Sequence, residues 1–147
     1  MTTLVPLTTS MEDYVETILQ LFVEKKGIRV SDIAERMEVS KPSVSAALQV
    51  LARQGLVNHE PYEVISLTSR GEKVARSVLR RHEILKRFLS DVLAIPAKDA
   101  EATACGMEHA ISAEVTEKLA CLLEAMSKCP GARASCLPAM KKARGAA

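Results

Sequence analysis

Apolar residues recur at helical spacing over most of the chain. The first such stripe lies between Thr8 and Gly27 and consists of Tyr14, Val15, Ile18, Leu21 and Phe22. Residues three or four positions apart share one face of a helix, so this segment predicts an amphipathic helix. Hydroxyl side chains at residues 8–10 are typical of a helix start. The residues 25–27, two lysines and a glycine, are typical of a helix end.

Two shorter helices and a hairpin are predicted next. After an extended linker at residues 28–30, Ser31 would begin a helix over residues 32–38, with a turn after it. Ser40 would then cap a helix that ends at Gly55 and carries Pro42 in its first turn, where the missing N–H does no harm. Residues 56–60 and 63–67 are strand-like and lie on either side of Pro61-Tyr62, which predicts a β-hairpin. This order of elements is that of a winged helix-turn-helix.

The rest of the chain is predicted to be helical. Thr68 and Ser69 begin a long helix that reaches about residue 93. Further helices follow at residues 98–110 and 113–126, the last one capped by Ser112. We therefore expect a mainly α protein, with a winged helix-turn-helix at residues 1–71, an all-helical domain at 72–128 and a C-terminal tail at 129–147.

Composition agrees with a helical fold and leaves the binding partner open. Aromatic residues make up 3% of the chain, and 20 Lys+Arg against 18 Asp+Glu give a net charge of +2. This balance neither requires nor excludes nucleic acid, because a local basic patch decides such binding. We see no signal peptide and no apolar run long enough for a membrane span, so we expect a cytoplasmic protein with reduced thiols.

The start of the helix after Ser40 is a candidate DNA-reading surface. Residues at the N-terminal end of a recognition helix face base edges and phosphates in the major groove. The polar or exposed candidates there are Ser40, Lys41, Pro42, Ser43, Ser45 and Gln49. Taken alone, this run is equally well explained as a helix cap with solvated polar residues. The complete order of helices and hairpin favours DNA binding.

Three segments offer side chains that bind transition metals. Cys105, Glu108 and His109 lie at positions i, i+3 and i+4, which share one face of a helix. Asp13 and Glu16 are also three apart, and His82 lies between the two sets. Each has a simpler reading: helix-dipole acids for Asp13 and Glu16, a surface histidine for His82, and a core thiol beside an exposed pair for the last segment.

The chain resembles the DtxR/MntR family of metal-dependent regulators from residue 11 to about residue 126. The resemblance rests on the motifs MEDYVE (11–16), VSDIA (30–34), VSKPSVS (39–45), LTSRG (67–71), RHEIL (81–85) and GMEH (106–109). It implies a homodimer whose winged-helix domains bind palindromic operator DNA and whose helical C-terminal domains form the dimer interface. It also implies a divalent metal that fixes the DNA-binding domains at operator spacing, with repression as the default outcome.

The resemblance also implies a set of metal ligands: Asp13, Glu16, His82, Cys105, Glu108 and His109. Asp13 matches the carboxylate of manganese-responsive members, whereas Cys105 matches the cysteine of iron-responsive members. Lys86 stands where some iron-type members carry a carboxylate of an accessory site. We expect Fe(II) or Mn(II), with Fe(II) slightly ahead, and binding of Zn(II) or Co(II) in vitro.

Two other functions remain open at this point. One is a metal-independent winged-helix regulator that senses thiol oxidation through Cys105 or the Cys129/Cys136 pair. The other is an enzyme that uses the Cys105, Glu108 and His109 trio, which we do not expect because no phosphate loop or oxyanion-type turn is present. We expect Cys121 to be a core residue and His59 not to be a ligand. Cys129 and Cys136 make only a weak zinc signal.

Overall fold

The computed structural model describes residues 7–60, 64–129 and 131, and the chain divides into two compact units between Leu79 and Arg80. This division falls within a helix, and the domain boundary expected after Gly71 stays a prediction. The hairpin tip at Pro61-Tyr62, Cys136 and the basic tail lie outside the described residues. No helix in the described part of the chain is both long and apolar enough to cross a membrane.

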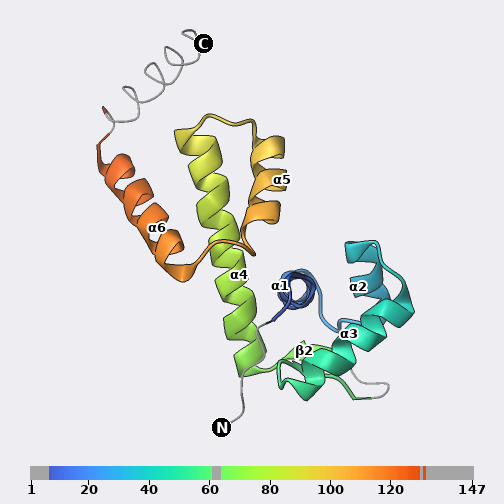
Figure 1. Cartoon of the computed structure of the whole chain (residues 1–147). Coiled ribbons are helices and arrows are strands. Elements are labelled where there is room, and N and C mark those ends of the chain that lie inside the picture. Colours follow the sequence, from blue (N-terminus) through green and yellow to red (C-terminus); the bar gives the residue numbers. More distant parts are fainter. Residues whose placement is uncertain (1–6, 61–63, 130, 132–147) are drawn as a thin grey trace. The chain divides into compact units, whose positions relative to one another are not determined.

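The N-terminal unit contains the predicted helix-turn-helix and hairpin (Figure 1). Its elements are α1 (Thr9–Glu24), α2 (Val30–Met37), α3 (Lys41–Arg53), β1 (Val57–Asn58) and β2 (Ser66–Leu67). The strands pair antiparallel, with Val57 opposite Leu67, and Ile28 forms an isolated bridge to Ile65. The fold class predicted from the sequence is confirmed for this half.

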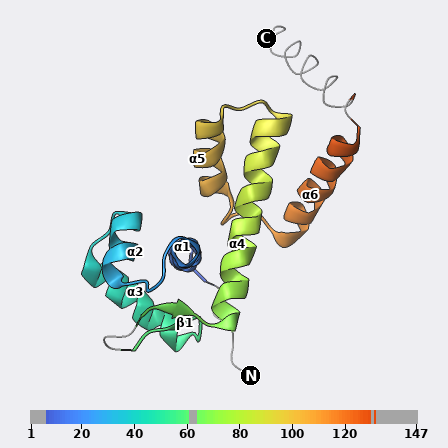
Figure 2. The same ribbon diagram turned by 180° about the vertical axis from the view of Figure 1, so that it is seen from behind.

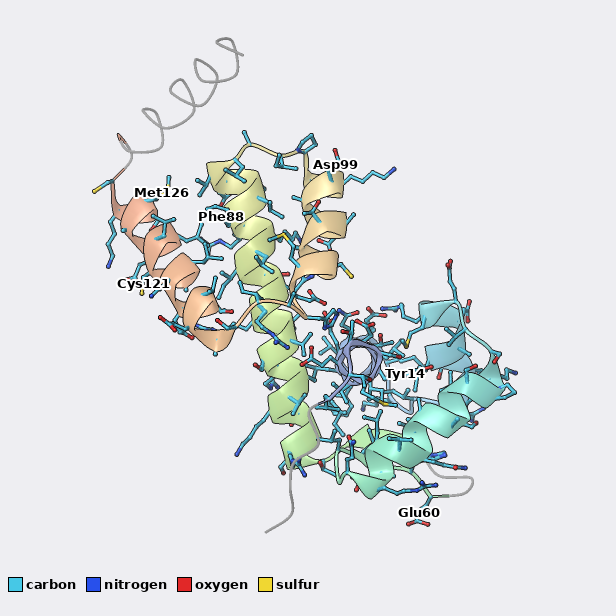
Figure 3. The ribbon with its side chains drawn as sticks, in the orientation of Figure 1. Tyr14, Glu60, Phe88, Asp99, Cys121 and Met126 are labelled. Atoms are coloured by element: carbon cyan, nitrogen blue, oxygen red, sulfur yellow. The ribbon has the colours of Figure 1, made fainter. Side chains whose placement is uncertain are left out.

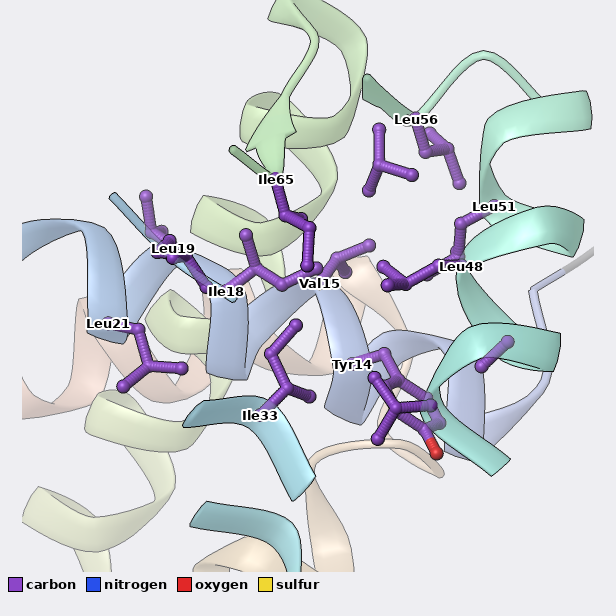
Figure 4. Close-up of a cluster of buried hydrophobic side chains, with 14 of the residues drawn as sticks. Tyr14, Val15, Ile18, Leu19, Leu21, Ile33, Leu48, Leu51, Leu56 and Ile65 are labelled. Atoms are coloured by element: carbon purple, nitrogen blue, oxygen red, sulfur yellow. The ribbon is translucent and has the colours of Figure 1, made fainter. Parts of the chain in front are cut away.

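A single apolar core holds these elements together. The side chains of Val15 and Ile18 from α1 meet Ile33 from α2 and Leu48 and Leu51 from α3, and all five are fully buried (Figure 4). Complete burial of an aliphatic side chain stabilises the fold by about 1.5–3 kcal/mol relative to exposure.

The predicted apolar stripe of α1 was wrong at its last residue. Phe22 is 67% exposed, whereas Leu19, which the stripe left out, is buried. The spacing placed Phe22 near the inner face. The covered face of the helix, however, is set by α2, α3 and β2, which the spacing does not describe.

Helix α2 begins earlier than predicted. Its N-cap residue is Arg29, not Ser31, and Val30 is helical rather than part of an extended linker. The Arg29 backbone N–H donates to Asp32 Oδ2 (2.7 Å), and Lys25 Nζ donates to Oδ1 (2.7 Å). The Lys25 hydrogen bond, followed by the backbone one, lowers the pKa of Asp32. The carboxylate at the third helical position therefore fixes this helix start.

The connection from the hairpin into α4 (Ser69–Arg87) is tightly packed. Thr68 Oγ1 donates to the Gly55 carbonyl (2.7 Å) and accepts from the Gly71 N–H (3.0 Å). Thr68 N–H also donates to the Leu56 carbonyl (3.0 Å). A Cβ on Gly71 would lie 1.9 Å from that carbonyl oxygen. Only glycine allows the helix to pass this close to the backbone before β1.

The C-terminal unit is helical, as predicted. The long helix does not remain α to residue 93, because Phe88–Val92 is a π-helix, η1, after α4 ends at Arg87. Helices α5 (Ala97–Met107) and α6 (Ala113–Lys128) lie on opposite sides of the C-terminal part of α4 (Figures 1 and 2). Their shared core comprises Leu85, Leu89, Ala100 and Ala104, with Leu93, Ile95, Ile111 and Leu119 packed against it.

Two expectations about this unit need correction. Cys121 on α6, expected in the core, is exposed, and its side chain lies near the outer side of that helix in Figure 3. Helix α5 ends at Met107 rather than at residue 110, so His109 follows the helix instead of lying on its face.

Candidate metal centre

The C-terminal unit contains a cluster of polar side chains centred on Glu108. This residue directly follows the last helical residue of α5. Its backbone N–H still donates to the Ala104 carbonyl (3.0 Å), so the helix sets its position. Ala100, Ala104 and Glu108 are all fully buried and spaced four apart, which places them on one face of α5. A carboxylate is almost never fully buried without a charged or metal partner.

His82 on α4 lies between two carboxylates. Its Nδ1 donates to Glu108 Oε2 (2.5 Å), and its Nε2 donates to Glu101 Oε1 (2.8 Å). Burial by itself lowers the pKa of His82, but the hydrogen bonds and charges of Glu108 and Glu101 outweigh it and hold that pKa above its usual value. A metal at this imidazole must displace a proton, so metal affinity should increase with pH.

Whether a cation fits this cluster can be judged from Oε1, the second carboxylate oxygen of Glu108. Among the described residues, Oε1 accepts no hydrogen bond although it is buried. His109 Nε2 lies 3.3 Å from it, and the His109 side chain is itself only 7% exposed. An unsatisfied buried carboxylate oxygen beside two imidazoles is a ligand arrangement that divalent first-row transition metals accept. His82, Glu108 and His109 therefore fit a metal.

Glu101 is part of this cluster and was not predicted from the sequence. Besides accepting from His82, it pairs through Oε2 with Lys86 Nζ (3.0 Å). The Lys86 hydrogen bond is the main cause that lowers the pKa of Glu101, and the same bond raises the pKa of Lys86. One signal was available: Glu101 precedes Glu108 by seven residues, two turns of the same helix.

Cys105 does not share the environment of Glu108. It is exposed on α5, although the predicted spacing placed both residues on one face. The buried residues are spaced four apart: Ala100, Ala104 and Glu108. Cys105 directly follows Ala104 and therefore lies on a different side of the helix. Its role as a ligand stays a prediction.

Asp13 and Glu16 lie one turn apart on α1 in the N-terminal unit. Glu16 is buried and accepts from Gln20 Nε2 (3.1 Å), and Asp13 is half-buried. Glu12 is the acidic residue in the first turn of α1. Asp13 and Glu16 lie beyond that turn, so interaction with the helix dipole does not explain them. The burial of Glu16 is unusual for a carboxylate. The ligand roles of Asp13 and Glu16 stay predictions.

The predicted DNA-reading residues lie at the start of α3. Ser40 is the N-cap, and its Oγ accepts from the Ser43 N–H (3.3 Å). Four of the others are exposed and one, Ser45, is half-buried; the exposed ones are Lys41, Pro42, Ser43 and Gln49. His59 directly follows β1, and its Nδ1 is buried without a hydrogen-bond partner among the described residues.

Comparison with known proteins gives the family. The model for the N-terminal DNA-binding domain of iron-dependent repressors matches residues 6–65, and the model for their metal-binding and dimerisation domain matches residues 68–135. An uncharacterised HTH-type transcriptional regulator of Methanocaldococcus jannaschii is 36% identical over 117 residues, which cover 78% of this chain and 93% of the relative.

A second relative and a solved structure are similar over most of this chain. The HTH-type transcriptional regulator MntR of Lysinibacillus sphaericus is 35% identical over 123 residues, covering 84% of this chain and 88% of MntR. A solved manganese-dependent transcriptional repressor in complex with manganese superposes with a TM-score of 0.72 at 29% identity, covering 78% of this chain. The chain spans about half the length, 52%, of that solved protein. By both domain models and these identities, the chain belongs to the iron-dependent repressor, or DtxR/MntR, family of metal-dependent transcriptional regulators.

Proposed function

We propose that this regulator is a repressor that binds operator DNA as a homodimer when loaded with Fe(II) or Mn(II), and that it acts in the cytoplasm on genes of metal homeostasis. The observation that carries the proposal is the buried Glu108, flanked by two imidazoles, with an oxygen that accepts no hydrogen bond from the described residues. We propose no enzymatic reaction, because the family consists of transcriptional regulators.

The proposed ligands come from both units: Asp13 and Glu16 on α1, then His82, Cys105, Glu108 and His109. Support comes from the burial of Glu16, His82 and Glu108, which removes these polar groups from water. Cys105 would have to bind from its exposed position on α5, so it is the ligand with the least structural support. Carboxylate oxygens favour Mn(II), and a thiolate adds affinity for Fe(II), Co(II) and Zn(II), which is why we name both physiological candidates.

The proposed mechanism is charge neutralisation between the two units. Without metal, the carboxylates of Asp13, Glu16 and Glu108 repel one another, so α1 is not held to the C-terminal unit. A bound divalent cation supplies the positive charge that removes this repulsion. Asp13 and Glu16 are then tied to His82 and Glu108, which favours the arrangement of the α3 helices that fits the operator. The coupling between two such sites is typically about 1–3 kcal/mol, or about 5–150-fold in affinity.

Affinity for operator DNA should change with metal to the extent that this coupling free energy predicts. Fluorescence anisotropy under anaerobic conditions would measure affinity for DNA taken from upstream of metal-transport genes, with Fe(II), Mn(II), Co(II), Zn(II) or chelator. We expect affinity to rise about 5–150-fold with Fe(II) or Mn(II), and the increase to disappear with chelator. Equal affinity under all conditions would contradict the metal switch. Dependence on thiol oxidation instead would revive the redox alternative, which the match to the iron-dependent repressor family does not favour.

Lys41→Ala is the matched control for this experiment. Lys41 is exposed at the first position of α3, far in sequence from every proposed ligand. Loss of one phosphate contact should weaken DNA binding on all sequences and reduce the salt dependence by about one unit of slope. Metal affinity should not change. The proposed DNA contact of Lys41 would be wrong if Lys41→Ala bound as the natural protein does.

Dimerisation is proposed through α6. Val115 and Leu122 are seven residues apart on this helix and are 47% and 43% exposed, which leaves an apolar stripe open on the C-terminal unit. We expect Leu122→Glu to be monomeric in sedimentation and to lose most of its affinity for a palindromic operator. Lys128→Glu introduces the same glutamate at an exposed position of α6 that lies on another side of the helix, six residues from Leu122, and should remain dimeric. A dimeric Leu122→Glu variant would place the interface elsewhere.

A further inference from the structure

His82 presents its two ring nitrogens to different surroundings. Nδ1 faces Glu108, whose side chain is 1% exposed, and Nε2 faces Glu101, whose side chain is 52% exposed. A histidine binds a metal through one nitrogen, and the group that accepts from the other N–H fixes the tautomer and the ring orientation. Nδ1 is directed to the buried side, where the unsatisfied oxygen of Glu108 lies.

Glu101 is held in place by a second contact. Its two oxygens serve different partners, because Oε1 accepts from His82 Nε2 at 2.8 Å and Oε2 pairs with Lys86 Nζ at 3.0 Å. Lys86 lies one turn after His82 on α4, so both partners reach Glu101 from the same helix. An exposed ion pair alone would contribute little. The Glu101–Lys86 pair matters because Glu101 also accepts a hydrogen bond from His82, whose side chain is only 8% exposed.

We propose that Glu101 is a positioning residue for His82. Its carboxylate retains the proton on Nε2 and leaves Nδ1 for the metal, and Lys86 keeps that carboxylate engaged so that it is not itself a ligand. The inference rests on the proposed function in one respect: it requires a divalent metal at His82 and Glu108. It concerns contacts within the C-terminal unit only.

The test uses the full chain labelled with ¹⁵N-histidine and loaded with ¹¹³Cd(II), a diamagnetic probe ion. In the natural protein, ¹¹³Cd should couple to Nδ1 of His82 while Nε2 remains protonated. Glu101→Leu removes the acceptor and should weaken Cd(II) binding about 10–100-fold, the usual effect of losing such a support. Its Nε2 proton should exchange faster with water. Glu101→Gln keeps an acceptor oxygen and should restore most of the affinity.

Glu83→Gln is the matched control. Glu83 lies beside His82 on α4, and its Oε1 is 4.0 Å from Lys86 Nζ, so the substitution removes the same charge from the same neighbourhood. Cd(II) affinity should stay at the natural value. Coupling of ¹¹³Cd to Nε2, unchanged affinity of Glu101→Leu, or failure of Glu101→Gln to restore binding would each overturn the inference. Failure of the proposed function would appear earlier, as a natural protein that binds no Cd(II), Mn(II) or Fe(II).

Discussion

Replacing Gly71 with alanine should destabilise the N-terminal unit by about 3 kcal/mol, the upper end of the usual cost of overpacking. The new Cβ would lie 1.9 Å from the Leu56 carbonyl oxygen and 2.8 Å from its carbon. Both are backbone atoms, and hydrogen bonds from Thr68 hold this region at Leu56 and at Gly55. The chain therefore cannot relax by turning a side chain. Urea unfolding followed by circular dichroism would measure the loss.

Gly106→Ala makes the same chemical change where space is available. Gly106 lies within α5, and no atom lies within 4 Å of the position its Cβ would take. Alanine is the better helix former by about 0.5–1 kcal/mol, so this variant should be slightly more stable. Equal unfolding midpoints for the two variants would show that the close approach at Gly71 does not constrain the fold.

Replacing Glu108 with glutamine should lower affinity for Mn(II) or Fe(II) by more than about 100-fold, beyond the 10–100-fold typical of a residue that only supports a ligand. Glutamine keeps the size of the side chain but removes the negative charge. Its neutral amide oxygen is also a weaker ligand for a divalent cation than the carboxylate oxygen it replaces. Competition against a fluorescent chelator would measure the affinity, and circular dichroism would verify that the variant folds.

The control for this change is Glu124→Gln. Glu124 is exposed on α6, where it pairs with Lys128, so the same substitution removes a charge without touching the cluster. It should bind metal as the natural protein does and keep its metal-dependent DNA binding. If Glu108→Gln retained its affinity, the buried carboxylate would be structural and the proposed metal centre would be wrong.

Local signals explain why much of the fold could be predicted from the sequence. Ser40, Pro42 and Gly55 mark the two ends of α3 by their own chemistry, and Ser112 marks the start of α6, so these helices were placed within a few residues. Ser31 was wrong as a cap because Asp32 captures the Arg29 N–H instead. Two hydroxyl or carboxylate residues side by side offer alternative starts that spacing cannot separate.

The candidate site was predictable in its residue types but not in its contacts. His82, Glu108 and His109 come together as expected, and this follows from the packing of α4 against α5. Glu101 was missed because its role depends on a hydrogen bond to a residue 19 positions away on another helix. Cys105 appeared equivalent to Glu108 on a helical wheel. The wheel does not show which of two neighbouring positions the packing buries, or that the helix ends at Met107.

The serine pair at the start of α3 constrains how the operator preference of this regulator could be redesigned. Ser40 Oγ already accepts from the Ser43 N–H, and the two hydroxyl oxygens lie 2.7 Å apart. Replacing Ser40 by alanine would cost about 1 kcal/mol of helix stability whatever DNA is offered. The Ser43 side chain caps no backbone N–H, so a library of variants aimed at new DNA sequences can vary residue 43 at the loss of one exposed hydrogen bond, while residue 40 must stay a capping residue.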